Sequence, residues 1–205
     1  MQNDLEIFIE KMKENLELLK NKKIPESYPE DITSSDNHYA MLKCNELNRE
    51  NFIKHSAYPL VSKDWIEMLA EYLKDKKCLE ISAKSGIISF ALAKNDIDIL
   101  PTESGDMLWD TWTDVERISP LNAIQEYIME RPYVILSWPD SSAYAYTLFM
   151  FMKTLNPESV MIYIGEVEEG SDFSKLKEID NDISKKINEK FLSWCGTKDY
   201  IRFLR

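Results

Sequence analysis

Two acidic residues at the ends of neighbouring apolar segments are the strongest candidates for ligand binding in this 205-residue sequence. Glu80 belongs to the apolar run 77–82, and Glu103 ends a second run that begins at Ile97. Gly86 lies between them in a turn of small residues, 17 residues before Glu103. In doubly wound folds, an acid about 20 residues beyond such a turn holds the ribose of a nucleotide. The spacing therefore predicts a nucleotide site in which Glu103 accepts two hydrogen bonds from a ribose diol.

The elements that must position these residues follow from the hydrophobic pattern. Residues 77–82 and 97–103 read as strands and 87–94 as the helix between them, which makes a strand–turn–helix–strand unit. Further strands are expected at 115–118, 133–138 and 160–166, and helices at 3–20, 39–54, 62–73, 119–128, 142–155 and 172–190. The run 142–155 is apolar on nearly every side, which predicts a helix buried all round. Residues 191–194 and 200–204 flank a short turn and read as an antiparallel hairpin.

This alternation predicts an α/β fold: a doubly wound, mostly parallel seven-stranded sheet with helices on both faces and a C-terminal β-hairpin. The prolines and polar residues of 21–37 read as a linker. The chain is therefore expected to consist of an N-terminal helical extension and linker over 1–57 and an α/β domain over 58–205. The helix at 3–20 has an apolar stripe that packs on the domain or forms a homodimer contact.

The composition limits the partners. A net charge of -11 disfavours general binding to nucleic acid or to an anionic membrane. No apolar run reaches the ~20 residues of a membrane span, and the first residues lack the pattern of a signal peptide. The three cysteines and two histidines fit neither a disulfide framework nor a metal site. These features predict a cytoplasmic protein whose partner is a small molecule or a protein.

The arrangement resembles the class I S-adenosylmethionine-dependent methyltransferases over roughly residues 58–205. Residues 79–86 are similar to the family's acid-x-Gly-x-Gly-x-Gly loop, 99–103 to its second strand with a terminal acid, and 136–140 to the strand end at its substrate. The resemblance implies a Rossmann-like fold with S-adenosylmethionine as cofactor. It places these residues at the cofactor: Glu80, Ser82, Lys84, Gly86, Glu103 and Ser119.

The resemblance also implies where the methyl acceptor lies. Ser137, Trp138 and Pro139 are similar to the Asn/Asp-Pro-Pro-aromatic motif of amino-group methyltransferases, so Trp138 and Pro139 are expected to shape the acceptor's slot. Glu166 ends another strand and is a candidate proton acceptor. Each has a structural alternative: Trp138 as core, Glu166 as an ordinary strand-end charge. For Asp140 we expect the cap of the following helix.

The loop departs from the family at two of its three glycines, which are replaced by Ser82 and Lys84. Glycine lets the backbone adopt unusual dihedral angles and approach a ligand closely. Lys84 is the severe change, because a cation here repels the sulfonium of S-adenosylmethionine by about 1 to 4 kcal/mol. Either Lys84 extends into solvent or the pocket no longer takes the cofactor.

Two functions follow from these alternatives. The first is S-adenosylmethionine-dependent transfer of a methyl group to a nitrogen or oxygen of a small molecule or protein. The second is a catalytically inactive, methyltransferase-like binding or regulatory module that has lost cofactor binding. A dinucleotide site is disfavoured because the Gly-x-Gly-x-x-Gly spacing is absent.

Overall fold

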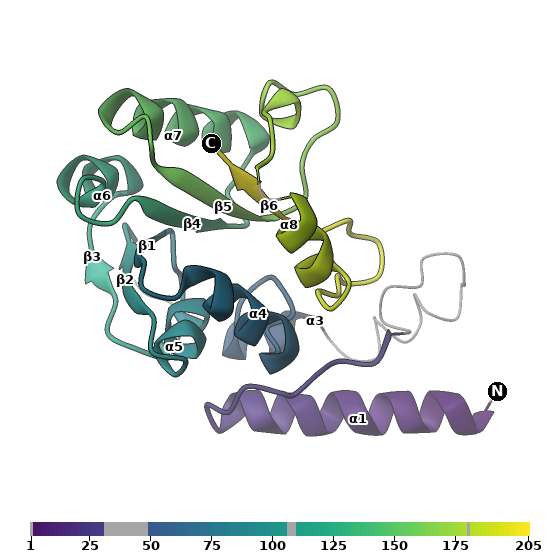
Figure 1. Cartoon of the computed structure of the whole chain (residues 1–205). Helices are drawn as coiled ribbons and strands as arrows, with labels where there is room; N and C mark the ends of the chain where they lie inside the picture. Colours follow the sequence, from purple (N-terminus) through teal and green to yellow (C-terminus); the bar gives the residue numbers. More distant parts are fainter. Residues whose placement is uncertain (1, 31–48, 106–109, 180) are drawn as a thin grey trace.

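The sheet at the centre of the molecule has the strand order β3-β2-β1-β4-β5-β6 (Figure 1). The structure is a computed structural model and describes residues 2–30, 49–105, 110–179 and 181–205. All neighbouring strands pair in parallel except β5 and β6, which are antiparallel. The strands are β1 (Lys77–Ile81), β2 (Asp98–Glu103), β3 (Glu116–Arg117), β4 (Tyr133–Ser137), β5 (Val160–Gly165) and β6 (Tyr200–Leu204). The fold is therefore α/β and Rossmann-like, as the sequence predicts.

Helices cover both faces of this sheet, because successive strand residues point to opposite sides. In β1, Leu79 and Ile81 pack with α6 and α7, whereas Cys78 packs with α4 and α5 on the other side. None of the described helices is both long and apolar enough to cross a membrane. The helices are α1 (Gln2–Lys20), α3 (Arg49–His55), α4 (Lys63–Leu73), α5 (Ile87–Ala93), α6 (Pro120–Tyr127), α7 (Ser142–Leu155) and α8 (Asn181–Asn188), with a 3-10 turn, η2 (Phe173–Lys175).

The N-terminal helix α1 lies along the domain beside α3, α4 and α5 (Figure 1). Its Phe8, Met12 and Leu19 are buried in the same core cluster as Phe52 and Trp65. The apolar stripe at helical spacing is thus covered within the chain, and a homodimer through α1 stays a prediction. Of the helix expected at 39–54, the structure describes α3, and the rest lies outside the described residues.

The predicted terminal hairpin is wrong in its first strand, and the sheet of the described residues has six strands instead of seven. β6 pairs with β5, but residues 191–194 have no strand structure. Phe191 and Trp194 are both buried, against Trp65 and Phe52 respectively. A strand would send residues three apart to opposite faces, so burying both aromatic rings in one core excludes it.

Two expectations about α7 are also wrong. The helix buries one side, through Ala145, Leu148 and Met152, but leaves Met150 45% exposed. Its N-cap is Ser141, whose hydroxyl accepts a hydrogen bond from the Tyr144 amide at 3.1 Å, and not Asp140. In α6 the expected cap is present, since Ser119 Oγ accepts from the Asn122 amide at 3.4 Å.

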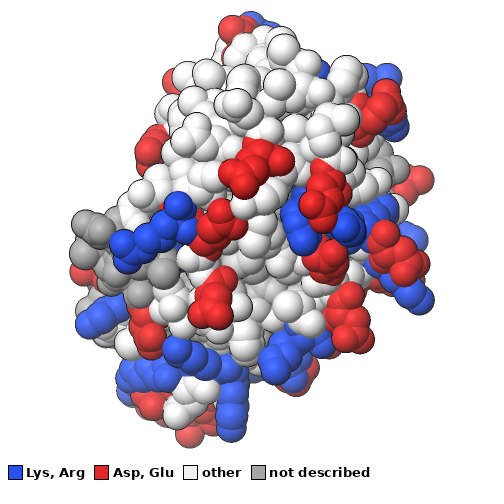
Figure 2. All heavy atoms as spheres, turned by 90° about the vertical axis from the view of Figure 1, so that its left-hand side faces the viewer, with Lys and Arg blue, Asp and Glu red and all other residues white. Residues whose placement is uncertain are grey.

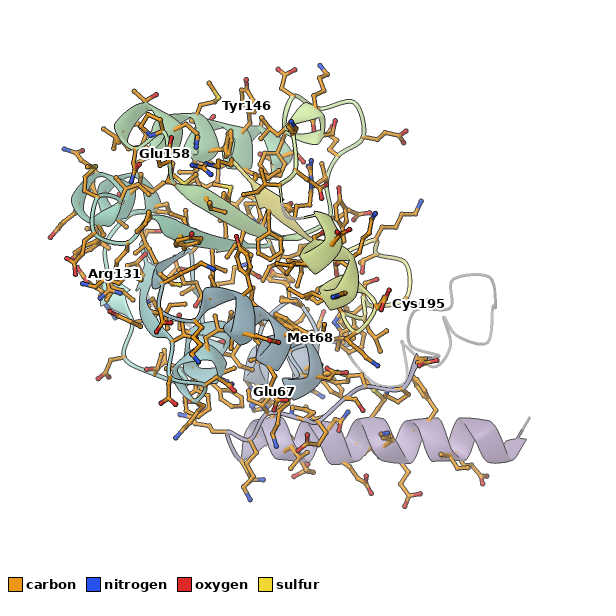
Figure 3. The ribbon with its side chains drawn as sticks, viewed as in Figure 1. Glu67, Met68, Arg131, Tyr146, Glu158 and Cys195 are labelled. Atoms are coloured by element: carbon orange, nitrogen blue, oxygen red, sulfur yellow. The ribbon has the colours of Figure 1, made fainter. Side chains whose placement is uncertain are left out.

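Arg131 joins the amino ends of β1 and β2 (Figure 3). Its guanidinium donates to the Cys78 carbonyl at 3.2 Å and to Asp98 Oδ1 at 2.6 Å. The Arg131 side chain is only 16% exposed, so this pair is less screened by water and contributes more to stability than an ion pair on the open surface. This contact fixes the end of the sheet opposite to the predicted ligand site.

The burial of α1 can be tested with a matched pair of substitutions on one helix. Met12 is fully buried and Ile7 is 56% exposed. We expect Met12→Ala to lower the free energy of unfolding by about 2–5 kcal/mol and Ile7→Ala to change it by less than about 0.5 kcal/mol. Urea unfolding followed by fluorescence measures both. Equal, small effects would show that α1 does not share the core.

Candidate functional site

The turn between β1 and α5 has the left-handed backbone that glycine favours, although it contains a single glycine. Ser82, Lys84 and Gly86 have φ angles of 55°, 53° and 71°, so every second residue is left-handed. A residue with a Cβ disfavours this region by about 1–2 kcal/mol, so Ser82 and Lys84 are held by their surroundings. Of these three positions, only position 86 lacks space for a side chain, because a Cβ there would lie 3.0 Å from methyl groups of Thr113 and Val115.

Glu103 holds this turn from the end of β2. Its Oε2 accepts the amide of Lys84 at 3.0 Å, and its Oε1 accepts the amide of Ser104 at 2.8 Å. Charge-assisted hydrogen bonds of this kind are about twice as strong as neutral ones. Both carboxylate oxygens that were predicted to meet a ribose diol therefore bind the chain's own backbone.

Glu80 is directed away from the site and into the protein. It is 1% exposed, and its Oε2 accepts hydrogen bonds from the amide and the hydroxyl of Ser89, in the first turn of α5. Burial raises the pKa of the Glu80 carboxyl to about 7, although the hydrogen bonds from Ser89 act in the opposite direction. Glu80 thus fixes the first turn of the helix that follows the loop.

The side chain of Lys84 crosses from the end of β1 to the end of β4. Its ammonium donates to the Trp138 carbonyl at 3.2 Å and lies 3.9 Å from the centre of the Tyr58 ring. Burial lowers the pKa of this ammonium to about 8, against the opposing charges of Glu103 and Asp140. The cation is therefore inside the region where an open α/β sheet binds its ligands and does not extend into solvent.

Aromatic rings and cations alternate around this point. The Tyr58 and Trp138 rings stack with centroids 5.4 Å apart, and Arg49 lies 5.8 Å from the Trp138 ring and 5.7 Å from that of Trp194. Trp138 has a φ of 47°, a strained value for a bulky residue. Its position directly after β4 was predicted. Tyr58 and Arg49 were missed, because nothing in their local sequence marks them.

A buried carboxylate behind Trp138 was also missed. Asp199 is 8% exposed, and its Oδ2 accepts the Thr197 hydroxyl at 3.1 Å. Burial raises the pKa of Asp199 to about 6, while Thr197 and the charge of Arg49 oppose this shift. Asp199 Oδ1, Trp138 Nε1 and Arg49 Nε complete no hydrogen bond within the described structure. In the sequence Asp199 looks like an ordinary turn residue, which is why no pattern identified it.

An acidic crevice of about 610 Å³ opens beside Trp138 at the ends of β4 and β5. It contains Pro139 and the exposed Glu166, two of the residues predicted at the methyl acceptor. Its charged residues are four acids and a single lysine: Asp140, Glu166, Glu168, Glu169 and Lys198. Tyr163 and Tyr200 complete its aromatic wall. A surface of this kind attracts cations.

Ser119, the residue expected at the adenine, acts as the cap of α6. Nearby Glu116 accepts a hydrogen bond from the Tyr127 hydroxyl at 2.8 Å. Both residues thus contact α6, Ser119 as its cap and Glu116 from the neighbouring strand β3. The structure brings Lys84, Gly86, Glu103 and Trp138 together, with Pro139 and Glu166 in the crevice beside Trp138. Glu80 and Ser119 have local structural partners instead.

These residues, as arranged, do not fit S-adenosylmethionine. The ammonium of Lys84 lies between the ends of β1 and β4, where it would repel a sulfonium, and a main-chain amide occupies one acceptor position on each Glu103 oxygen. Glu80 is enclosed and does not face the site.

Comparison with known proteins gives a likeness of structure alone. No protein-family model and no curated protein matches the chain. A SAM-dependent methyltransferase from Archaeoglobus fulgidus aligns at 12% identity with a TM-score of 0.45, over 82% of this chain and 99% of that one. A candidate O-methyltransferase from Nostoc punctiforme aligns at 13% identity with a TM-score of 0.40, over 96% of this chain and 68% of that one. Similarities this low carry no argument about activity.

The enclosed Glu80 makes stability depend on pH. Its folded pKa of about 7 lies above the ordinary 4.5, so the folded state binds the extra proton between these values. The associated stability is full below pH 4.5 and is lost as the pH rises to 7. We expect wild type to lose up to about 3 kcal/mol relative to Glu80→Gln between pH 5 and 8. Urea unfolding at both pH values measures this, and a pH-independent difference would contradict it.

Proposed function

We propose that this chain is a methyltransferase-like domain that works as a non-catalytic binding module, without S-adenosylmethionine. The observation that carries the proposal is the position of the Lys84 ammonium, 3.2 Å from the Trp138 carbonyl and 3.9 Å from the Tyr58 ring centre. This lysine supplies a positive charge where the cofactor of the resembling family would bring its own.

The energies involved are large enough to prevent binding at ordinary cofactor concentrations. Moving Lys84 out would break a charge-assisted hydrogen bond, about 1.5–3 kcal/mol, and a cation–π contact, about 0.5–2 kcal/mol. Leaving it in place would set two cations against each other. Since each 1.4 kcal/mol changes a dissociation constant tenfold, we expect a loss of affinity of about 10²–10³-fold.

The acidic crevice beside Trp138 supports a cationic ligand for such a module. Its carboxylates outnumber its lysine, and the exposed Glu166 is accessible to a partner. A small polyamine, or a basic segment of a protein, fits carboxylates set against aromatic rings. On the face that Figure 2 shows, charged residues of both signs gather in the middle and lower part, and much of the upper part is uncharged.

A second candidate is the methyltransferase itself, acting on a nitrogen or oxygen. It is favoured by the backbone of the turn, which keeps left-handed φ angles at Ser82, Lys84 and Gly86. In that function, Trp138 and Pro139 would shape the acceptor's slot, and Glu166 would accept its proton. It requires Lys84 to leave the site when the cofactor binds.

Calorimetry with S-adenosylhomocysteine, the demethylated form of the cofactor, and with S-adenosylmethionine distinguishes the two candidates. For wild type we expect no heat with either ligand at hundreds-of-micromolar concentrations. Lys84→Gly removes the cation and the strain, and is expected to bind at least tenfold more tightly than wild type. Ser82→Gly is the matched control, because it relieves the same backbone strain and leaves Lys84 in place. Micromolar binding by wild type, unchanged in Lys84→Gly, would overturn the non-catalytic function.

The crevice is tested separately with spermidine as a cationic probe. We expect binding that weakens as salt is added and that falls at least fivefold in the double variant Asp140→Asn/Glu166→Gln. Glu10→Gln/Glu14→Gln on the exposed face of α1 makes the same change of net charge elsewhere, and should leave binding within twofold of wild type. Equal losses in both variants would mean that spermidine responds to net charge alone.

A further inference from the structure

A second cavity lies away from this site, between the N-terminal segment and the domain. This α4–α5 cleft has a volume of about 450 Å³, which is within the usual range of small-molecule sites. One wall is the end of α1 and the residues after it, and the other is formed by α4 and α5. Figure 3 shows Glu67, one of its residues, on the side of α4 toward α1.

The inside of the cleft is apolar. Ile66 of α4 and Ala91 of α5 are 1% and 3% exposed and form its base. Leu18, Ile24 and Phe90 are half-buried around them. When a hydrocarbon replaces water on such a surface, the free energy falls by about 25 cal/mol for each Å² that is covered.

The rim of the cleft is basic, in a chain of net charge -11. Four lysines and two glutamates surround it, a local excess of two positive charges that becomes one when the Lys22 partner Asp110 is counted: Lys22, Lys23, Lys63, Lys94, Glu26 and Glu67. Lys63 pairs with Glu26, and Lys22 lies 3.2 Å from Asp110. Within the described part of the chain, Lys23 and Lys94 form no ion pair, and Lys94 lies 5.4 Å from the centre of the Phe90 ring at the edge of the apolar base. Two cations at this rim are therefore available to a carboxylate.

We propose that the α4–α5 cleft binds an amphiphilic carboxylate, of the chemical class of a medium-chain fatty acid. The hydrocarbon chain lies against Ile66, Phe90 and Ala91, and the carboxylate meets Lys23 and Lys94 at the rim. A purely apolar ligand would leave the two lysines unused, and a cationic one would be repelled by them. Charge complementarity therefore selects an anion, and the apolar base selects a long chain.

This site is independent of the proposed function, because the cleft and the acidic crevice have no residue in common. Its two walls come from segments far apart in the sequence, one from the N-terminal segment and the other from the α/β domain. A ligand that binds only when the walls are together stabilises the folded chain by RT ln(1 + c/Kd) at a free ligand concentration c, so the stabilisation increases with its concentration. Binding is thus expected to raise the melting temperature.

The test uses the full chain and three probes: acetate, and the surfactants dodecanoate and dodecyltrimethylammonium below their critical micelle concentrations. We expect dodecanoate to bind in calorimetry and to raise the melting temperature, and the other two to do neither. The double variant Lys23→Gln/Lys94→Gln is expected to weaken dodecanoate binding at least fivefold. Lys11→Gln/Lys185→Gln changes two exposed lysines outside the cleft and should leave binding within twofold.

Each result bears on the proposal. Stronger binding of dodecanoate than of the ammonium surfactant, lost in Lys23→Gln/Lys94→Gln and kept in the control, would support it. Equal binding of the two surfactants would show a non-specific detergent effect and overturn it. The absence of dodecanoate binding, or equal affinities of the two double variants for dodecanoate, would also overturn the proposal. All four lysines are exposed, so both variants should fold, and their unliganded melting temperatures verify this.

Discussion

The hydrogen bond from the Lys84 amide to Glu103 Oε2 is the interaction on which the site depends. It ties the turn after β1 to the end of β2 and holds left-handed backbone that neither Ser82 nor Lys84 prefers. Ser89 binds Glu80 on the other side of the turn, so the helix that follows is fixed as well. With the turn held in this way, the Lys84 side chain is directed across the sheet edge to Trp138.

The left-handed turn and the inward lysine support each other. With the backbone kept in a glycine-type conformation, the side chain at position 84 projects between the ends of β1 and β4. Tyr58 and the Trp138 carbonyl then receive its charge. Burial and the charge of Glu103 have opposing effects on the Lys84 pKa. The ammonium loses water, but it gains the favourable charge of Glu103 and contacts with a ring and a carbonyl.

Much of the fold could be predicted from the sequence, because apolar periodicity marks elements that are buried on one or both faces. The strand ends at Glu80 and Glu103 follow from that pattern, and Gly86 follows from turn chemistry. The direction of Lys84 could not be predicted, since its carbonyl acceptor is 54 residues away in the chain. Arg49, Tyr58 and Asp199 were missed for the same reason. The predicted hairpin is absent because burying both Phe191 and Trp194 in one core stabilises the chain more than strand pairing would.

The position of Lys84 has a consequence for regulation. A diffusible ligand occupies its site according to its concentration, and so reports on the metabolic state of the cell. Lys84 is attached to the chain, and its effective local concentration is fixed by covalent geometry. A site filled in this way does not empty on dilution, and a metabolite occupies it only at concentrations high enough to displace Lys84. The domain would keep one constitutive shape, and any signal it receives must arrive through another surface.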